Sequence, residues 1–537
     1  SGYTNAASDF AFYYGQVRGK YEIYGGLTPD LNKFKSYGLT GTIAYELTDN
    51  LTVKSLTGYR NIAQIQNQDW DRTPIPLVQL NDTTNIEYFT QELQLNGSFF
   101  DNRFKWVAGA FYYWDDSINI RRRFDPSAGA NSASQGDVGK GSFESKHIKT
   151  ESVALFTQGT FAVTDALSLT GGVRWGEDKK TFTSFREGRG QVCIAGGQRV
   201  AAVGTPASCP AGSVSTPAAQ TVNGKWSSVS PRFSIDYRWS PEIMTYISAA
   251  KGYKGGGFND GIQTRCYRSP LPDCGLNEYM PENLWTYEAG IRTDLFDRRA
   301  RFNIAGYIMD RKNSQVDLST IQPTATGNFN NLITFNAPGI TKIRGIEADL
   351  TVKPTQGLTV GASYAYTYTN VPEVPVTYRE FTSAGVATGN VTTVPQKFYI
   401  VFTPRNAASG SIDYELPVSG DTRVKFHLDA NYSQATQAFD QFATKADQSF
   451  IVNGRVSLLD IDMGNGPKLN LSVWGRNLFN YQYVYRRDPS NSLPSVQTTA
   501  AAGVPNVLVI ANNGGILGDY GNFNMPRTFG IDASVKF

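Results

Sequence analysis

The sequence lacks any long apolar run. No stretch of about 18 or more consecutive apolar residues occurs in the chain of 537 residues, which excludes membrane-spanning helices. A dominant charge is lacking too, because 50 Lys and Arg against 47 Asp and Glu leave a net charge of +3. That balance gives no reason to expect a nucleic-acid partner. An initiator Met and a targeting segment are also missing, so we expect further sequence upstream of Ser1.

Candidate catalytic and metal-binding residues are equally scarce. The two histidines, His147 and His427, lie far apart in the sequence, and the glycine-rich run 251–257 lacks the order of a phosphate-binding loop. Four cysteines are present without C-x-x-C spacing or an adjacent histidine, which argues against zinc. We therefore expect no enzyme activity, no cofactor and no bound metal.

What the sequence does contain is aromatic residues at 13%, 52 glycines and runs of alternating polarity. The last run shows the pattern most clearly. Phe529, Ile531, Ala533, Val535 and Phe537 fall on one side of a strand, and the polar or small residues between them fall on the other. A soluble sheet would have to cover the apolar side with a second layer, whereas a membrane barrel has lipid outside and a wet lumen inside. Such alternation also makes a mean hydropathy of -0.33 compatible with a membrane protein.

Short turns and long connections alternate along the chain. Short polar turns occur at 48–50, 100–102, 164–166, 240–242, 297–299, 354–357, 417–421 and 464–467. Long stretches lie near 61–85, 120–145, 185–224, 252–280, 316–338, 372–398 and 485–524. Alternation of this kind is typical of outer-membrane barrels, which have short periplasmic turns and long outer loops. The predicted fold class is therefore an all-β, transmembrane, antiparallel β-barrel.

About 17 strands can be counted, an odd number where single-chain bacterial barrels have an even one. The first strand is expected at roughly 38–47, with residues 1–37 as a surface loop or irregular lead-in and residues 38–537 as one barrel domain. About five further strands would give about 22, for which the lumen is wide enough to need a plug. In the run 424–432, alternation also places Lys425, His427, Asp429 and Asn431 in the lumen.

Several motifs resemble the barrel of TonB-dependent outer-membrane receptors. The longest are Ser248–Asn259, Pro281–Arg292 and Arg301–Arg311. Shorter ones are Lys54–Arg60, Gln91–Leu95, Trp106–Tyr113, Asn477–Tyr483 and Pro526–Gly530. The resemblance covers roughly residues 38–537. It implies a barrel of about 22 strands in the cell outer membrane, filled by an N-terminal plug, that imports a scarce nutrient with energy passed on by TonB.

The resemblance also implies ligands and partners. The family's commonest role is uptake of a ferric siderophore or a similar metal chelate. The TonB complex would act through a plug that this sequence does not contain, supplied by upstream residues or by a separate plug subunit. Outer-membrane lipid and lipopolysaccharide are expected around the barrel, and a lipoprotein over the loops is left open. A passive porin or structural barrel is the alternative function, and a secreted all-β enzyme, which would need paired carboxylates, is the third.

Four residues are candidates for an outer ligand site. They are Trp70, Tyr253, Lys254 and Phe258, which lie in two of the expected outer loops. The alternative is that all four pack loops or lie at the membrane interface. Unchanged ligand affinity after replacing Tyr253 and Phe258 with alanine would exclude those two.

The four cysteines indicate an oxidising compartment. Cys193 and Cys209 lie in one expected outer loop, and Cys266 and Cys274 lie in the next. Pairing within each loop would close small rings, which favours disulfides over a metal site. The masses of unreduced peptides test this hypothesis, and four free thiols would contradict it.

Deletion of Phe537 is expected to lower the amount of protein inserted into the outer membrane. In the family that the chain resembles, a terminal aromatic residue is read by the barrel-assembly machinery. The alternative is that Phe537 is only one more lipid-facing ring. Burial of its apolar area would then stabilise the protein by about 2 kcal/mol. Inserted yield and assembly rate of the deletion variant are the measurements, and normal values for both would leave Phe537 without an assembly role.

Overall fold

The computed structural model describes most of the chain as strands joined by turns. It describes residues 31–69, 79–124, 142–186, 192–195, 198–202, 214–216, 219–259, 278–324, 327–381, 387–464, 466–488, 494–497, 507–510 and 520–536. Within these ranges, no helix is long and apolar enough to cross a membrane. Every regular element found there is a β-strand.

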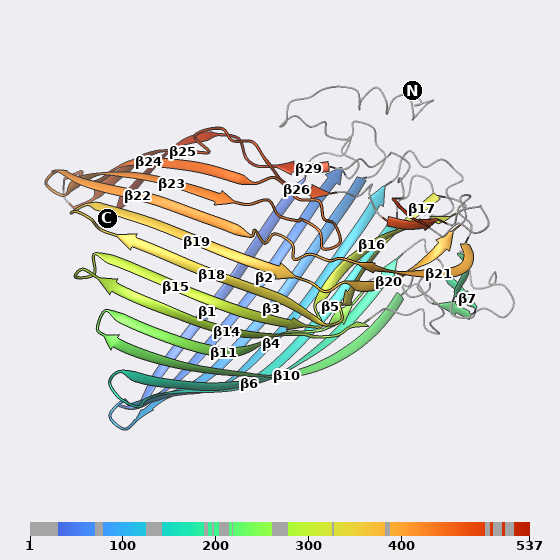
Figure 1. Cartoon of the computed structure of the whole chain (residues 1–537), viewed down its shortest axis with the longest axis horizontal. Helices are drawn as coiled ribbons and strands as arrows, with labels where there is room; N and C mark the ends of the chain where they lie inside the picture. The colour runs from blue at the N-terminus through green and yellow to red at the C-terminus, as the bar shows by residue number, and fades with distance from the viewer. Residues whose placement is uncertain are drawn as a thin grey trace.

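Seventeen strands form one antiparallel sheet. In chain order they are β1 (Asn32–Thr48), β2 (Leu51–Asp69), β3 (Gln79–Phe99), β4 (Phe104–Phe124), β5 (Ser142–Ala162), β6 (Leu167–Arg186), β10 (Ala219–Ser240), β11 (Ile243–Lys254), β14 (Glu282–Leu295), β15 (Ala300–Lys312), β18 (Ile340–Val352), β19 (Leu358–Asn370), β22 (Asn406–Ser419), β23 (Thr422–Ser433), β24 (Ser449–Asp462), β25 (Lys468–Arg476) and β30 (Thr528–Lys536). Each pairs with the next in this order. Figure 1 shows the sheet curling so that its first strands pass behind later ones. The strand count and the antiparallel order confirm the predicted fold class.

The two edges of this sheet are β1 and β30. In the described part of the chain they are not paired with each other, so the barrel is open between them. β1 begins at Asn32 and not at the predicted 38, because residues 32–37 pair with residues 61–66 of β2. Pairing with β2 thus makes residues 32–37 part of the strand, although their weak alternation of polarity does not predict a strand there.

All eight predicted short turns join neighbouring strands, and they lie together at one end of the sheet (Figure 1). Between β3 and β4 the chain turns through Phe100, Asp101 and Asn102, whose φ angles of 55°, 53° and 66° are left-handed. Between β18 and β19, Gly357 has a φ of 80°, and a Cβ there would lie 2.2 Å from the carbonyl oxygen of Glu415. Only glycine fits such a position. We call this end the turn end and the opposite end the loop end.

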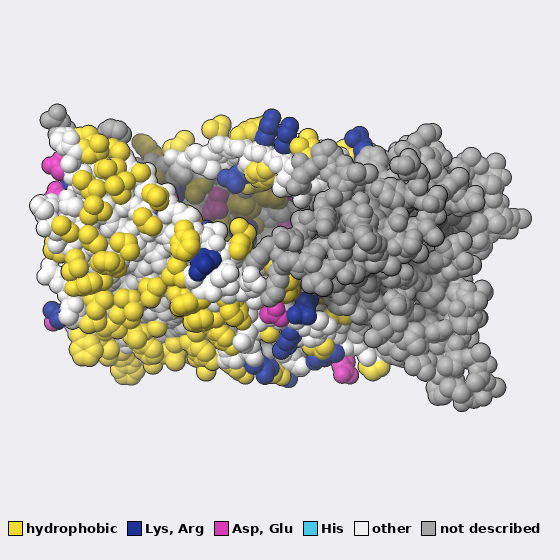
Figure 2. Space-filling view, turned by 90° about the horizontal axis from the view of Figure 1, so that it is seen from above, with side chains coloured by type: hydrophobic (Ala, Val, Ile, Leu, Met, Phe, Trp, Pro, Cys, Tyr) yellow, Lys and Arg dark blue, Asp and Glu magenta, His cyan; other side chains and the backbone are white. Residues whose placement is uncertain are grey.

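The outer face near the turn end is apolar. Phe233 and Trp239 on β10 are 59% and 67% exposed, and Phe529 and Ile531 on the last strand are exposed as well. Figure 2 shows hydrophobic side chains forming a broad belt over this end of the molecule. A continuous apolar surface of this extent is what a barrel presents to lipid. The predicted alternation is confirmed for residues 233–239 and for the described part of the final strand, Thr528–Lys536.

Several strands extend well beyond the belt. β2 to β6 and β10 have between 19 and 22 residues, whereas crossing a membrane takes about 9–11. The connections between these long strands are correspondingly shorter than predicted: β2 and β3, for example, are joined by 70–78 and not by 61–85. One long connection is absent from the sequence prediction, namely residues 434–448 between β23 and β24. The extensions escape a pattern search because apolar residues such as Ile62 and Ile65 of β2 are scattered over both faces among polar ones.

Shorter strands lie at the loop end. They are β7 (Val192–Ala195), β8 (Gln198–Ala202), β9 (Val214–Thr216), β12 (Gly257–Phe258), β13 (Glu278–Tyr279), β16 (Gln315–Thr324), β17 (Gly327–Asn336), β20 (Val374–Phe381), β21 (Ala387–Gln396), β26 (Val484–Asp488), β27 (Pro494–Gln497), β28 (Val507–Ile510) and β29 (Tyr520–Phe523). An apolar cluster, here called the loop core, consists of Val316, Leu318, Ile333, Ala337, Val371, Val374, Val376 and Phe398. The connections that carry it therefore have a folded structure of their own, which can hold side chains in fixed positions.

Candidate ligand-binding site

The chain that follows β11 bends closely against the sheet. A Cβ on Gly256 would lie 2.6 Å from Cε2 of Trp226 on β10 and 2.7 Å from the carbonyl oxygen of Tyr279. Lys180 on β6 donates a hydrogen bond to the Gly256 carbonyl oxygen at 2.9 Å. Immediately afterwards, β12 pairs Gly257 with Tyr279. The glycine-rich run is therefore a tightly packed bend, in which small residues permit the approach of backbone and ring.

Phe258 belongs to an aromatic cluster that anchors this bend. Its ring is nearly parallel to that of Phe182, at 4° and 6.4 Å between centroids, and lies 5.8 Å from the Trp226 ring. Phe182 and Trp226 are both buried, and Trp226 Nε1 donates to Glu278 at 2.9 Å. Phe258 thus makes the packing contacts that were the alternative interpretation, and its contact with a ligand stays a prediction.

Tyr253 and Lys254 precede the bend and have different surroundings. The Tyr253 hydroxyl, Asp178 and Lys180 surround Gly255, each within 3.0–3.8 Å of where a Cβ would stand. Lys254 instead lines a cavity of about 380 Å³, together with residues from several other connections. Of the three predicted ligand-site residues that the structure describes, Tyr253, Lys254 and Phe258, it places Lys254 in this cavity.

The cavity lies at the loop end, beside the loop core. Its charged and phenolic lining consists of Lys254, Tyr279, Arg311, Asp317, Tyr399 and Asp440, and its apolar lining includes Val316, Val371, Ile400 and Val401. The charged groups come from four elements: β11, β15, β16 and the connection 434–448. Small-molecule sites have volumes of roughly 300–1,000 Å³, and this cavity falls in that range, with more polar groups in its lining than most such sites have.

The hairpin β16–β17 is held over this cavity by polar contacts. Asn259, which is buried, donates to the Thr334 carbonyl oxygen at 2.6 Å and accepts the Thr334 N–H at 2.7 Å. The Asp317 N–H donates to Asp440 Oδ2 at 2.8 Å, which joins the hairpin to the connection 434–448. These contacts and the loop core give the site a defined shape before any ligand binds.

The protonation of two groups in the cavity is shifted by their surroundings. Burial raises the pKa of Asp440 to about 6, and the nearby Asp317 carboxylate adds to this effect. Burial also raises the pKa of the Tyr279 hydroxyl, as does Asp317. Tyr279 therefore stays a neutral donor at physiological pH, whereas Asp440 takes up a proton in mildly acidic medium.

Sequence reasoning identified Lys254 but missed the other polar residues of the cavity. Arg311 ends the motif Arg301–Arg311, and Asp440 lies in the connection 434–448, which the predicted order of turns and long stretches does not include. A signal for that connection was available. The short turns at 417–421 and 464–467 follow each other in the predicted order without a long stretch between them, which breaks the strict alternation.

The remaining candidate residues are outside the described part. Trp70, Cys209, Cys266, Cys274 and Phe537 lie in ranges that the structure does not describe. Cys193 lies in β7, and its side chain is not described. Their proposed roles stay predictions.

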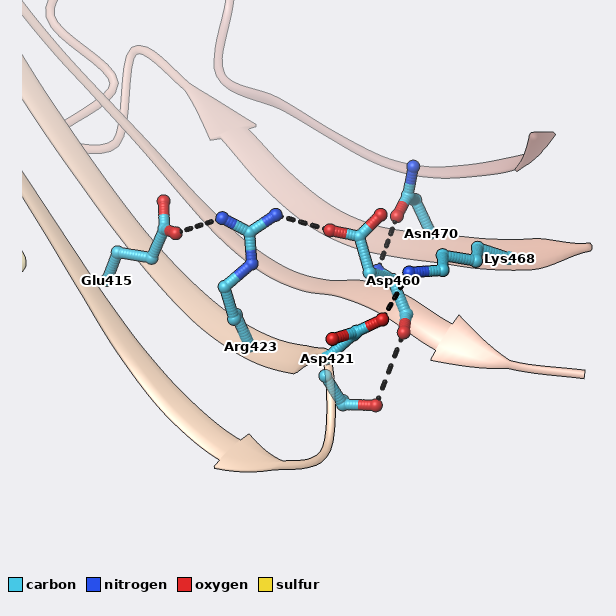
Figure 3. Close-up of polar contacts among 7 residues, drawn as sticks. Glu415, Asp421, Arg423, Asp460, Lys468 and Asn470 are labelled. Atoms are coloured by element: carbon cyan, nitrogen blue, oxygen red, sulfur yellow. Dashed lines mark hydrogen bonds and ion pairs between the residues drawn. The ribbon is translucent and has the colours of Figure 1, made fainter. Parts of the chain in front are cut away.

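A second polar region covers the inner wall near the turn end. Figure 3 shows the Arg423 guanidinium between the carboxylates of Glu415 and Asp460, and the Lys468 ammonium paired with Asp421. These residues come from β22, β23, β24, β25 and the turn between β22 and β23. Ion pairs that link successive strands in this way fix the geometry of the wall more than they stabilise the fold.

The residues predicted to line the lumen extend this network. They are Lys425, His427, Asp429 and Asn431. Lys425 Nζ and His427 Nδ1 both lie 3.0 Å from Asp413 Oδ1, and Phe426 and Leu428 between them are exposed on the opposite face. The predicted placement is confirmed.

These features define the class of protein. A curled antiparallel sheet with an apolar belt outside, ion pairs inside, short turns at one end and folded connections at the other is the wall of a transmembrane β-barrel. The chain matches the family described as TonB dependent receptor-like, beta-barrel, over residues 1–478. It belongs to this family and is therefore an integral protein of the outer membrane.

Solved receptor structures share the fold. The ferric yersiniabactin uptake receptor FyuA from Yersinia pestis has a TM-score of 0.62 at 14% identity, covering 94% of this chain and 62% of that chain. The siderophore receptor PiuA from Acinetobacter baumannii has a TM-score of 0.60 at 14% identity, covering 94% and 65%. The ferric-catecholate import receptor Fiu from E. coli K12, closed form, has 0.59 at 13% identity, covering 95% and 65%. The chain thus spans less than two thirds of the length of these receptors.

Proposed function

We propose that the protein imports a scarce nutrient across the outer membrane, binding it at the loop end and releasing it inward with energy from TonB. The observation that carries this proposal is the cavity of about 380 Å³ at the loop end of a TonB-dependent receptor barrel. A ferric siderophore or a similar metal chelate is the proposed nutrient, because similar receptors take ferric yersiniabactin, a siderophore and a ferric catecholate. The role is transport and not catalysis.

A plug and further strands are part of the proposal. The inner wall has a hollow of about 600 Å³ near the turn end, whose lining includes Glu288, Arg292, Arg301, Glu347 and Asp349. A wall with so many charges suits contact with a polar, folded segment or with water. The open edges of β1 and β30 would likewise be closed by strands that pair with them, since unpaired edges invite such pairing. We propose that further polypeptide, in the same chain or in a separate subunit, both fills the space beside the charged wall and closes the open edges.

Lipopolysaccharide is the proposed lipid partner at the edge of the apolar belt that faces the loop end. Lys149, Lys179 and Lys225 lie on β5, β6 and β10, and each is more than half exposed. Lys179 and Lys225 are directly opposite in the register, and Glu177 is the carboxylate near both, at 3.8 and 3.0 Å. Phosphate groups of the outer leaflet would offset the remaining repulsion between these two lysines.

The test of transport uses the full-length receptor in iron-limited cells whose own copy is deleted. Uptake of radiolabelled ferric chelates should require the receptor and should stop when TonB is removed or the proton gradient is collapsed. A passive porin would admit the chelate without TonB and would conduct ions in planar bilayers. Uptake that persists without TonB would therefore overturn the energised importer in favour of the porin.

A further inference from the structure

The carboxylates of the cavity already have donors within the protein. Asp317 Oδ1 accepts a hydrogen bond from the Thr334 hydroxyl at 2.6 Å, and Asp440 Oδ2 accepts one from the Asp317 N–H at 2.8 Å. Glu282, beside the cavity, accepts the N–H of Gln315 at 2.9 Å. The acidic groups are thus used to hold the hairpin β16–β17 in place.

The cationic and phenolic groups of the cavity differ from its carboxylates in their hydrogen bonding. The Lys254 ammonium and the hydroxyls of Tyr279 and Tyr399 line the space, and none has a hydrogen-bond partner among the residues that the structure describes. The Arg311 guanidinium lies 3.8 Å from Glu282, which is too long for a hydrogen bond and leaves its N–H groups available. Ammonium and guanidinium groups can only donate, so an occupant that offered donors would leave them unsatisfied.

Building on the proposed function, we propose that the cavity takes an anionic, oxygen-rich chelate whose carboxylate or phenolate oxygens accept hydrogen bonds from Lys254, Arg311, Tyr279 and Tyr399. Hydrogen bonds between charged partners are roughly twice as strong as neutral ones, so the two cations would dominate the selectivity. The apolar lining would contact the carbon skeleton of the chelate. A cationic chelate would instead leave the donors without acceptors, and once Asp440 is protonated the two cations Lys254 and Arg311 would outnumber the remaining carboxylate of Asp317.

Asp440 adds a pH dependence to this site. The charged and phenolic groups around it are Asp317 from β16, Lys254 from β11, Arg311 from β15 and Tyr399. Since the pKa of its buried carboxyl is about 6, protonation removes a negative charge from the cavity as the pH falls toward that value. Affinity for an anion should therefore rise from pH 8 to about pH 6, by at most about tenfold per pH unit for one proton taken up. In Asp440→Asn the pH profile should be flat.

The experiment compares three chelates of different charge on the intact receptor in detergent. They are ferric citrate, which is anionic, ferrichrome, which is neutral, and ferrioxamine B, which is cationic. Ferric citrate should bind most tightly, and Lys254→Gln should weaken its binding by roughly tenfold or more, the value of one hydrogen bond to a charged group. Lys251→Gln is the matched control, because Lys251 is on the same strand and does not line the cavity. Thermal midpoints establish that each variant is folded.

The possible outcomes separate the two proposals. Preferential binding of ferric citrate that is lost in Lys254→Gln and kept in Lys251→Gln supports the inference. Equal or tighter binding of ferrichrome or ferrioxamine B, or equal affinities of the two lysine variants, overturns the anionic site and leaves chelate import standing. If none of the three chelates binds, the anionic site is overturned as well. Whether the protein is an importer is then decided separately, by the TonB-dependent uptake of other chelates.

Discussion

Replacing Phe398 with alanine is expected to release the β16–β17 hairpin from its position over the cavity. Phe398 is 0% exposed within the loop core, where its ring meets that of Phe335 edge-on at 5.6 Å between centroids. Removing a fully buried phenylalanine costs about 3–5 kcal/mol, which is large for a cluster of this size. Hydrogen exchange of residues 315–336 should therefore become fast, while the strands of the barrel keep their protection.

The matched control is Phe479→Ala. Phe479 is 74% exposed, so its removal leaves no cavity, and exchange at the hairpin should match the parent. The affinity for any chelate that the receptor binds should fall in Phe398→Ala only, because Asp317 and Val316 of the hairpin form part of the cavity wall. A hairpin that stays protected in Phe398→Ala would mean that the polar contacts of Asn259 and Asp440 hold it without the loop core.

The second large effect is expected for Gly256→Ala. Its Cβ would stand 2.6 Å from the Trp226 ring and 2.7 Å from the Tyr279 carbonyl oxygen, closer than real Cβ atoms come. The carbonyl belongs to backbone that is paired between β12 and β13, so it cannot retreat without disturbing that pair. Overpacking of this kind costs about 1–3 kcal/mol. Faster hydrogen exchange of residues 253–259 and 278–280 and a lower thermal midpoint are the expected observations.

Gly41→Ala is the corresponding control. Gly41 lies in β1 of the seventeen-stranded sheet, and nothing stands within 4 Å of where its Cβ would be. A methyl group there should be neutral or slightly stabilising, because alanine restricts the unfolded chain more than glycine does. Equal exchange in the two alanine variants would show that Trp226 can move aside, and that the bend does not depend on a glycine at 256.

The part of the fold that lies in the membrane could be predicted from the sequence. A strand with lipid on one side and water on the other must alternate, so Phe233 to Trp239 and Phe529 to Val535 carry their orientation in their own order of residues. The turns are equally local, because a tight reversal needs left-handed backbone conformations at particular residues. These are supplied by residues 100–102 in one turn and by Gly357 in another. These constraints involve neighbours in the chain, and a sequence displays them directly.

The loop end could not be predicted in the same way. Above the belt, apolar residues are scattered over both faces of a strand among polar ones, so the extensions of β2 to β6 carry no clear periodic signal that distinguishes them from loops. The loop core is assembled from two separate connections, 313–339 and 371–405, and Phe398 carries no local sign that it will be buried. Side-chain burial of this kind depends on which distant segments meet.

The sequence by itself determined a transmembrane barrel wall, its short turns and the inward direction of Lys425 and His427, since each follows from alternation or from a turn within a few residues. Only the tertiary structure decided which residues form the cavity. Lys254, Arg311, Asp317 and Asp440 are separated by up to 186 positions along the chain, and they meet because β11, β15, the β16–β17 hairpin and the connection 434–448 are brought together at the loop end. Convergence of that kind is set by strand pairing and loop packing, which are non-local and leave no pattern at any one of the four positions.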